Sequence, residues 1–268
     1  MIGSPHPLTE KLLVGKSDQI GWITFNNPAR HNAVSLSMWQ ALSQAVAQFA
    51  ADDDVRVVVL TGAGDRAFVS GADISEFNDK RGAEEAVEFY NKTSQEASAA
   101  LKSLGKPTIA MIRGYCIGGG LGIALACDMR IASKNSTFAV PAAKLGLGYE
   151  YEGVRTLMSV VGPSFTKEIF YTARQFNCDE ALTMGLVNRA VETEELESYV
   201  TRYAQTIAGN APLTVRSIKT IVTEALKDEG KRDVALCDAV VKACFDSEDY
   251  VEGRTAFMEK RKPQFKGR

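Results

Sequence analysis

Backbone amide groups, rather than reactive side chains, are the first chemical feature of this sequence. Glycines stand at positions 114, 118, 119, 120 and 122, after the apolar residues 108–112 and before the small apolar residues 123–126. This order predicts a buried strand, a glycine turn and a tightly packed helix. The first N–H groups of a helix have no intrahelical acceptor, and the helix dipole adds to their positive charge. The turn is therefore suited to binding negative charge, although such a turn can also serve close packing alone.

A second strand end is also followed by small residues that can present a backbone N–H group. Residues 57–60 predict a short apolar strand, and a turn of small residues follows it. The next stretch, 67–74, again ends in small residues, among which Ala72 can present its N–H group. Two N–H groups from separate strand ends can form an oxyanion hole, which stabilises charge that develops on a carbonyl oxygen.

Other known glycine and nucleophile motifs do not fit. If Gly118 and Gly120 began a dinucleotide-binding fingerprint, Ile123 would stand where the third glycine belongs. A phosphate-binding P-loop would end in Gly-Lys-Ser or Gly-Lys-Thr, and no such triplet follows. With two histidines and no Gly-x-Ser-x-Gly stretch, a serine-hydrolase triad is unsupported as well.

Four spaced motifs resemble the crotonase, or enoyl-CoA hydratase/isomerase, superfamily. They are Asn26-Asn27-Pro28 with His31-Asn32-Ala33, Phe-x-x-Gly-Ala-Asp-Ile at 68–74, the glycine stretch running to Cys-Asp at 114–128, and Met184-Gly185-Leu186-Val187. The resemblance covers most of residues 15–266. It implies an α/β fold, a spiral of ββα repeats with a C-terminal helical appendage. It also implies a coenzyme A thioester whose enolate is held by the N–H groups of Ala72 and Gly119.

The resemblance further implies which residues surround the acyl-CoA. Arg30 is expected to contact its phosphates, and Phe265 and Lys266, in the basic tail, its nucleotide part, although a basic tail can also be solvated only. The substrate itself carries coenzyme A, so we expect no separate cofactor and no metal. The remaining residues expected to bind the substrate are Ala33, Ser70, Gly71, Asp73, Ile74, Gly118, Pro141 and Leu145.

The two glutamates that a hydratase of this family uses are missing. One is expected three residues after Gly119, where this chain has Gly122, and the other directly after Pro141, where it has Ala142. Neither residue can transfer a proton, so hydration by the usual route with two carboxylates is doubtful.

Glu150 is the candidate acid/base instead. It lies nine residues beyond Pro141, where isomerases of the superfamily resembled here carry a single glutamate. Leu145, Leu147, Tyr149 and Tyr151 predict apolar surroundings that would raise its pKa towards the range useful for proton transfer. Glu150 and Glu152 can alternatively cap or solvate the helix expected to begin near Gly153.

Several reactions therefore remain open. The first interpretation is an enolate proton transfer, either isomerisation of an enoyl-CoA double bond or a related hydratase or lyase step. The second is an enoyl-CoA hydratase that activates water through one acid. The third is a catalytically silent acyl-CoA-binding homologue. Nucleophilic attack by Glu150, as in the 4-chlorobenzoyl-CoA dehalogenase of the superfamily, is weaker because neither His6 nor His31 matches the histidine required.

Composition limits the class of protein. With 268 residues, 45% hydrophobic, the chain suits one globular domain or one with an appendage. Its net charge of −2 gives no general attraction to nucleic acid or to an anionic membrane. Five cysteines without a C-x-x-C pair predict reduced thiols in a cytoplasmic protein. Neither a signal peptide nor an apolar run of about 18 residues is visible.

The remaining pattern divides the chain in two. Residues 1–204 are expected to form the core with the acyl-CoA site, and residues 205–268 an all-helical region, because apolar residues recur there at helical spacing. In the family resembled, this region packs subunits into trimers, often paired into hexamers. We therefore expect a homotrimer or a dimer of trimers.

Overall fold

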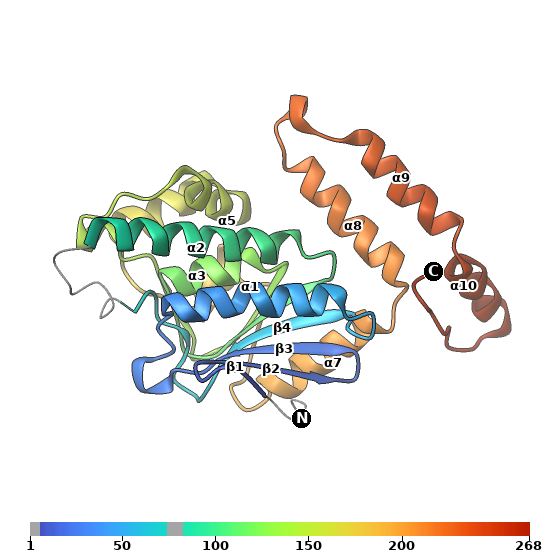
Figure 1. Cartoon of the computed structure of the whole chain (residues 1–268), viewed down its shortest axis with the longest axis horizontal. Coiled ribbons are helices and arrows are strands. Elements are labelled where there is room, and N and C mark those ends of the chain that lie inside the picture. Colours follow the sequence, from blue (N-terminus) through green and yellow to red (C-terminus); the bar gives the residue numbers. More distant parts are fainter. Residues whose placement is uncertain (1–5, 74–82) are drawn as a thin grey trace.

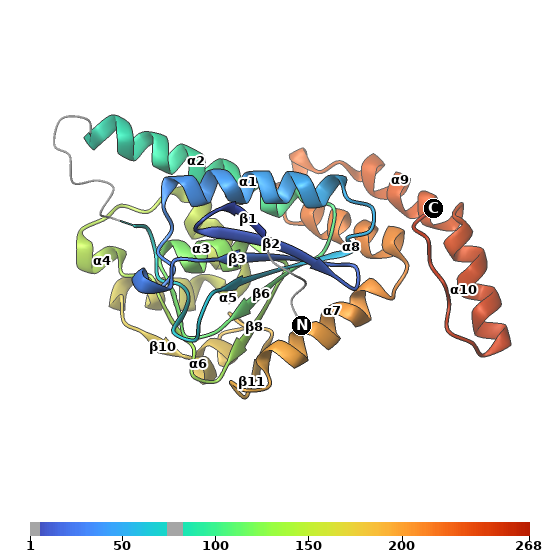
Figure 2. The same cartoon turned by 60° about the horizontal axis from the view of Figure 1, so that its bottom comes forward.

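Two β-sheets form the centre of the chain, which a computed structural model describes over residues 6–73 and 83–268 (Figures 1 and 2). The larger sheet contains, in spatial order, β1 (His6–Thr9), β2 (Leu12–Ser17), β3 (Ile20–Phe25), β4 (Val57–Gly62), β6 (Thr108–Ile112), β8 (Met129–Ser133) and β11 (Arg189–Val191). The smaller sheet contains β10 (Phe176–Asn177), β9 (Thr137–Ala139), β7 (Tyr115–Ile117) and β5 (Ala67–Val69).

Successive turns of the chain repeat one pattern. Strands β4, β6 and β8 pair in parallel in the larger sheet, and each leads into a strand of the smaller sheet, β5, β7 or β9, which also pair in parallel. A helix follows each pair of strands: α2 (Ala83–Ser103), α3 (Gly119–Ala126) and α4 (Ala142–Leu145). The spiral of ββα repeats predicted from the resemblance is thus confirmed.

Side chains alternate between the two faces of the larger sheet, and both faces are buried. Ile20, Trp22 and Val57 pack against α7 (Leu196–Ala208), whose Leu196 and Val200 are fully buried. Intervening residues such as Ile23, Phe25 and Leu60 face the opposite side, covered by α1 (Leu36–Ala51) and α2, which lie side by side in Figure 1. This alternation is what a pleated strand requires when helices cover both faces.

Local signals set several element ends. Ser35 caps α1, since its side chain accepts the N–H of Met38 at 3.3 Å. At α6 (Cys178–Thr183), Asn177 and Glu180 form a reciprocal capping box. Strands β2 and β3 form a hairpin, whose turn lies at Asp18 and Gln19, both with positive φ.

One expectation needed correction. The glycine stretch does not pass directly from strand to helix, because residues 115–117 form the separate strand β7 in the smaller sheet. Within α5 (Tyr151–Thr172), two helical segments meet at a kink, where Gly162 has a non-helical backbone conformation with a φ of 74°. Glycine supplies this backbone conformation at low cost.

The C-terminal helices extend away from one end of the sheets (Figure 1). They are α8 (Pro212–Ala225), α9 (Val234–Phe245) and α10 (Glu248–Glu259), and the 3-10 turn η3 (Glu229–Lys231) lies between α8 and α9. Another 3-10 turn, η1 (Pro28–Arg30), precedes α1. Helix α7 continues past residue 204 to Ala208 and packs on the larger sheet. The boundary expected at residue 204, between the core and the C-terminal helical region, therefore falls within a helix and stays a prediction.

Polar contacts join this region to the core. Nζ of Lys219 on α8 donates to Oδ2 of Asp128 at 2.9 Å and to the carbonyl oxygen of Lys106 at 3.0 Å. The guanidinium of Arg56 donates to the carbonyl oxygens of Ala208 and of Phe265. These two hydrogen bonds hold the end of α7 and the C-terminal tail, residues 260–268, against the residue that precedes β4.

Within the described ranges, no helix has the length and apolar character needed to cross a bilayer. The same ranges contain no group of three or more His, Cys, Asp or Glu side chains arranged to hold a metal ion.

Helix α3 approaches strand β5 so closely that position 120 has no room for a side chain. A Cβ on Gly120 would lie 2.1 Å from the carbonyl oxygen of Val69 and 2.8 Å from its carbonyl carbon. Both are backbone atoms of a strand paired in the smaller sheet, so they cannot move aside cheaply. At Gly122, in the same helix, nothing lies within 4 Å of the corresponding position.

These two glycines form a matched pair for a stability test. We expect Gly120→Ala to lower the free energy of unfolding by roughly 1–3 kcal/mol, the usual cost of overpacking. Gly122→Ala should instead raise it by roughly 0.5–1 kcal/mol, because alanine favours the helix. Urea unfolding of both variants measures the difference, and equal stabilities would contradict the close approach.

Candidate active site

Ala72 lies directly after β5, on a short parallel bridge with Val34. The N–H of Val34 donates to the carbonyl oxygen of Gly71 at 2.8 Å, and the N–H of Asp73 donates to the carbonyl oxygen of Val34 at 2.9 Å. Both bonds use the residues on either side of Ala72, so its own N–H points away from Val34. Over residues 6–73 and 83–268, the N–H of Ala72 has no hydrogen-bond acceptor.

Gly119 is the first residue of α3. The preceding residue, Gly118, turns the chain with a φ of 54° and donates its N–H to the carbonyl oxygen of Ala139 at 2.8 Å. The hydrogen bond from Gly122 N–H to Gly118 oxygen, at 3.1 Å, closes the first helical turn, so the N–H of Gly119 has no intrahelical acceptor. A Cβ on Gly119 would lie 3.8 Å from the nitrogen of Ala72. The two predicted donors therefore lie on adjoining segments.

A buried asparagine holds the loop before α1 against the turn that leads to β5. Asn32 is fully buried, and its Nδ2 donates to the carbonyl oxygens of Ala63 and Ala67, at 3.0 and 2.8 Å. Its Oδ1 accepts the N–H of Asn27 at 2.9 Å. Asn32 thus supports the loop that carries Ala72.

Most of the predicted substrate-binding residues gather around this loop. The buried carboxylate of Asp73 accepts a hydrogen bond from Arg30 at 3.3 Å, and Ser70 Oγ donates to the carbonyl oxygen of Arg30 at 3.3 Å. The carbonyl oxygen of Ala33 accepts a hydrogen bond from Nδ2 of Asn27 at 3.2 Å. Cδ of Pro141 lies 4.0 Å from a Cβ built on Gly118. Their contact with a substrate stays a prediction.

A cavity of about 600 Å³ opens beside Gly119 and contains the candidate acid/base. Gly119 and Glu150 both line it, although 30 residues separate them in the chain, and Glu150 is the residue that precedes α5. Nε2 of Gln95, on α2, donates to Oε2 of Glu150 at 2.6 Å. No described residue donates to Oε1, which leaves one carboxylate oxygen available.

The apolar surroundings predicted for Glu150 come from different residues. Leu145, Leu147 and Tyr151 are 65%, 61% and 74% exposed and do not line the cavity, so that expectation was wrong for them. Tyr149 does line it and packs edge-on against Phe170, with ring centroids 4.8 Å apart. Burial raises the pKa of the Tyr149 hydroxyl. The other apolar walls are Trp39, Leu121, Leu125, Val140 and Leu157.

The positions of the two missing glutamates differ in their access to the cavity. Gly122 lines it, and its Cβ position is free of neighbours within 4 Å. Ala142 is buried at the start of α4 and is not part of the lining. A carboxylate at 122 would have had room, so its absence is a property of the sequence and not of the packing.

The other predicted residues lie elsewhere or outside the described ranges. Phe265 lines a second cavity, of about 1010 Å³, between α8 and the core. Lys266 pairs with Glu248 on α10, at 3.8 Å, and donates its N–H to Asp249. Neither is near Gly119 within this chain. Ile74 lies outside the residues that the structure describes.

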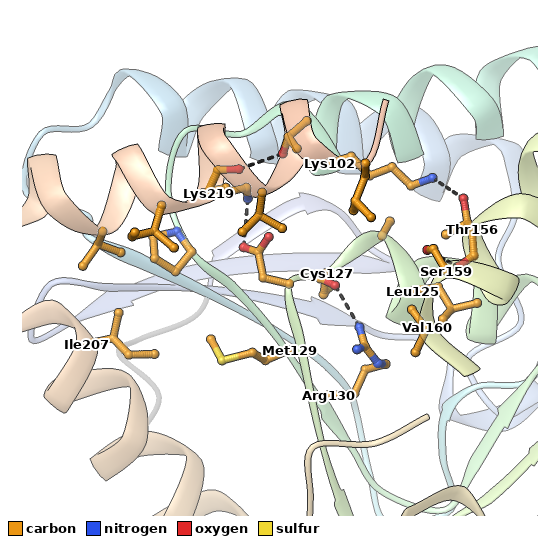
Figure 3. Close-up of a pocket in the computed structure, with 18 of the residues that line it drawn as sticks. Lys102, Leu125, Cys127, Met129, Arg130, Thr156, Ser159, Val160, Ile207 and Lys219 are labelled. Atoms are coloured by element: carbon orange, nitrogen blue, oxygen red, sulfur yellow. Dashed lines mark hydrogen bonds and ion pairs between the residues drawn. The ribbon is translucent and has the colours of Figure 1, made fainter. Parts of the chain in front are cut away.

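Sequence reasoning missed the residues of α2 that line the site. Besides Gln95, they include Lys102, whose Nζ donates to Oγ1 of Thr156 on α5 at 2.8 Å (Figure 3). Gln95 and Lys102 are seven residues apart and therefore share one helix face. That spacing was a usable signal, but the charges of residues 75–104 were interpreted as a solvated surface.

The cysteine thiols offer no competing nucleophile at this cavity. Burial raises the pKa of Cys116 far above its ordinary value and raises the pKa of Cys127 to about 12. The pKa of Cys178 is raised to about 11, again by burial. These thiols therefore stay protonated near neutral pH, and none of them lines the cavity beside Gly119.

This fold and site define a class of enzymes, α/β spirals in which main-chain N–H groups stand beside a cavity carrying a carboxylate. The family model "Enoyl-CoA hydratase/isomerase" matches residues 15–268. The crotonyl-CoA hydratase of Syntrophomonas wolfei is 35% identical over 256 residues, covering 96% of this chain and 98% of its own. The short-chain-enoyl-CoA hydratase of Clostridium acetobutylicum is 34% identical over 258 residues, with the same coverage.

Solved structures agree with these matches. An enoyl-CoA hydratase/carnitine racemase from Magnetospirillum magneticum superimposes with a TM-score of 0.90 at 35% identity, covering 97% of both chains. This chain belongs to the enoyl-CoA hydratase/isomerase family, in the crotonase superfamily. It is accordingly an enzyme of acyl-CoA thioesters.

The support that Asn32 gives the site can be tested by stability. We expect Asn32→Leu to lower the free energy of unfolding by roughly 3 kcal/mol or more, because it leaves buried groups of Asn27, Ala63 and Ala67 unpaired. The control is Asn26→Ala, which removes one exposed hydrogen bond to Glu10 and should cost under about 1 kcal/mol. Chemical unfolding of both variants decides, and a similar cost for the two would refute the assigned role of Asn32.

Proposed function

We propose that the enzyme transfers a proton on the enolate of an enoyl-CoA thioester, with Glu150 as its single acid/base. The observation that supports this most directly is the shared cavity of Gly119 and Glu150. The N–H groups of Ala72 and Gly119 hold the thioester oxygen. Charge that develops on this oxygen as the enolate forms is stabilised by two fixed donors.

The proton moves in two steps. The Glu150 carboxylate removes a proton from one carbon of the acyl group, and the electron pair left behind shifts the double bond and charges the thioester oxygen. Protonated Glu150 then returns the proton to another carbon, and the electrons flow back. The net result is migration of the double bond. Gln95 is a positioning residue, since its bond to Oε2 leaves Oε1 to take the proton.

Hydration is the second candidate, because two similar relatives are named hydratases. In that reaction Glu150 would activate a water molecule for addition to the double bond. The lack of a carboxylate at Gly122 and Ala142 favours isomerisation, since water addition in this family normally uses two carboxylates.

The assembly is part of the proposal. Helices α8–α10 expose large apolar side chains, among them Phe245, Phe257 and Met258, which are 60%, 82% and 80% exposed in the single chain. Burial of such surface favours association. We propose a homotrimer or a dimer of trimers, an enzyme without a separate cofactor, and a cytoplasmic location.

The first functional test replaces the acid/base. We expect Glu150→Gln to lower kcat roughly 10²–10⁴-fold, the usual contribution of general acid–base catalysis, while thioester binding persists. Assays follow both double-bond migration and water addition on a panel of enoyl-CoA thioesters. Glu152→Gln is the matched variant, since Glu152 lines the same cavity. Loss of activity in Glu152→Gln alone would transfer the role to Glu152, and a wild type without turnover would indicate a binding protein.

The second test removes one oxyanion donor and keeps the helix. Proline is well tolerated at the first position of a helix but has no N–H, so Gly119→Pro deletes the donor with little harm to α3. We expect kcat to fall roughly 10²–10³-fold. Gly119→Ala keeps the N–H, and its Cβ would meet only ordinary contacts at 3.8 Å, so it is the control. Steady-state kinetics and circular dichroism of both variants are compared, and equal activity would refute the oxyanion role.

A further inference from the structure

One wall of the cavity beside Gly119 is mostly polar. Six residues of α2 line it, of which only Ala99 is apolar; the other five are Asn91, Ser94, Gln95, Ser98 and Lys102. The hydroxyls of Ser94 and Ser98 donate to carbonyl oxygens of their own helix, and Gln95 is bonded to Glu150. This leaves Lys102 as the polar group with unused donors at the end of the row remote from Glu150.

The helices α3 and α5 supply apolar side chains to the cavity. These are Leu121 and Leu125 of α3 with Leu157 and Phe170 of α5, and α5 adds the polar side chains of Glu152 and Thr156. A ligand that fits both sets of side chains has a hydrocarbon body and a polar group at its far end. An acyl chain with a plain methyl terminus would leave the polar end of the cavity unmatched.

Lys102 is a cation without a partner carboxylate. In the described part of the chain it is the one cationic residue that lines this cavity, and its ammonium group makes no ion pair there. Its single hydrogen bond goes to the Thr156 hydroxyl, at 2.8 Å, so two of its three N–H donors remain.

The electrostatic surroundings of Lys102 favour an anion. Lys102 is exposed as a residue because two cavities open onto it, yet the protein around its ammonium group displaces enough water to lower its pKa. The nearby charge of Arg155 adds to this lowering, and that of Glu152 opposes it. Glu152 is itself 3.9 Å from Arg155. Glu152 thus compensates the charge of Lys102 only in part and makes no ion pair with it, and a ligand carboxylate would add to that compensation.

Lys102 also lies at a definite depth. Lys102 is seven residues beyond Gln95 on α2, so these two residues lie about 10 Å apart along the helix axis. The amide of Gln95 is hydrogen-bonded to Glu150. Beyond this lysine, the larger cavity shares Lys102, Thr156, Leu125 and Glu152 with the smaller one, and the bond from Lys102 to Thr156 lies at that junction (Figure 3). The lysine therefore stands where the end of a medium-length acyl chain would arrive.

We propose that Lys102 selects acyl-CoA thioesters whose acyl group ends in a carboxylate. This rests on the proposed function, because it takes the thioester end of the substrate to lie at Gly119 and Glu150. The carboxylate accepts the two free N–H groups of Lys102, and the methylene chain lies along the apolar side chains of α3 and α5. The substrates are thus monothioesters of unsaturated dicarboxylic acids.

The test compares two matched ligands on the full-length protein. Isothermal titration calorimetry measures the binding of decanoyl-CoA and of sebacyl-CoA, which differ only in the terminal carboxylate. We expect the wild type to bind sebacyl-CoA roughly tenfold more tightly, the scale of one hydrogen-bonded charge pair. Lys102→Met keeps most of the stem and should abolish this preference, whereas Lys102→Arg should retain it. Lys92→Met, an exposed lysine of the same helix outside the cavity, should also retain it.

The outcomes separate this inference from the proposed function, since both ligands are saturated and need no proton transfer to bind. Equal affinity in the wild type, or a preference that survives in Lys102→Met, overturns the role of Lys102. A carboxylate preference without turnover of 2-decenoyl-CoA or 2-decenedioyl-CoA would refute the proposed reaction alone.

Discussion

The close approach of one helix start to one strand end is the constraint on which the site depends. Gly120 has no side chain, so α3 can lie directly against the carbonyl group of Val69. This contact brings Gly119 next to Ala72, and the bridge to Val34 directs the Ala72 N–H away from the sheet. The donors are main-chain groups on paired elements, so their position is set by packing and needs no side-chain rearrangement.

The proposed acid/base comes from another element than the two glutamates that the resemblance led us to expect. The face of α3 that borders the cavity has no carboxylate at Gly122, and Glu150 lies instead before α5, hydrogen-bonded to Gln95 of α2. A carboxylate that approaches from α5 can reach different carbons of an acyl chain than one on α3. In this proposal the oxyanion donors and the acid/base lie on separate elements, so a change in the second can alter the reaction while the first is kept.

Sequence reasoning succeeded where the determinants are local. Strands β4 and β6 and helix α3 follow from apolar runs and the glycine turn, and the fold followed from motifs shared with a family. It failed where distant segments decide. Strand β7 has three residues and exists through pairing with β5 and β9. Much of the lining around Glu150 comes from α2 and α3, 25 or more residues away in the chain, whereas its neighbours Leu145, Leu147 and Tyr151 do not contribute.

The hydrogen bond between Arg56 and the carbonyl oxygen of Phe265 has a consequence for biosynthesis. Arg56 precedes β4, early in the chain, yet the carbonyl oxygen that it binds belongs to Phe265, 209 residues later. Domains begin to fold from the N-terminus while the ribosome is still adding residues. The sheets can form at that stage, but this guanidinium must wait until Phe265 has been synthesised before its acceptor arrives. The contact between Arg56 and residue 265 therefore forms later in synthesis than the strands of the two sheets.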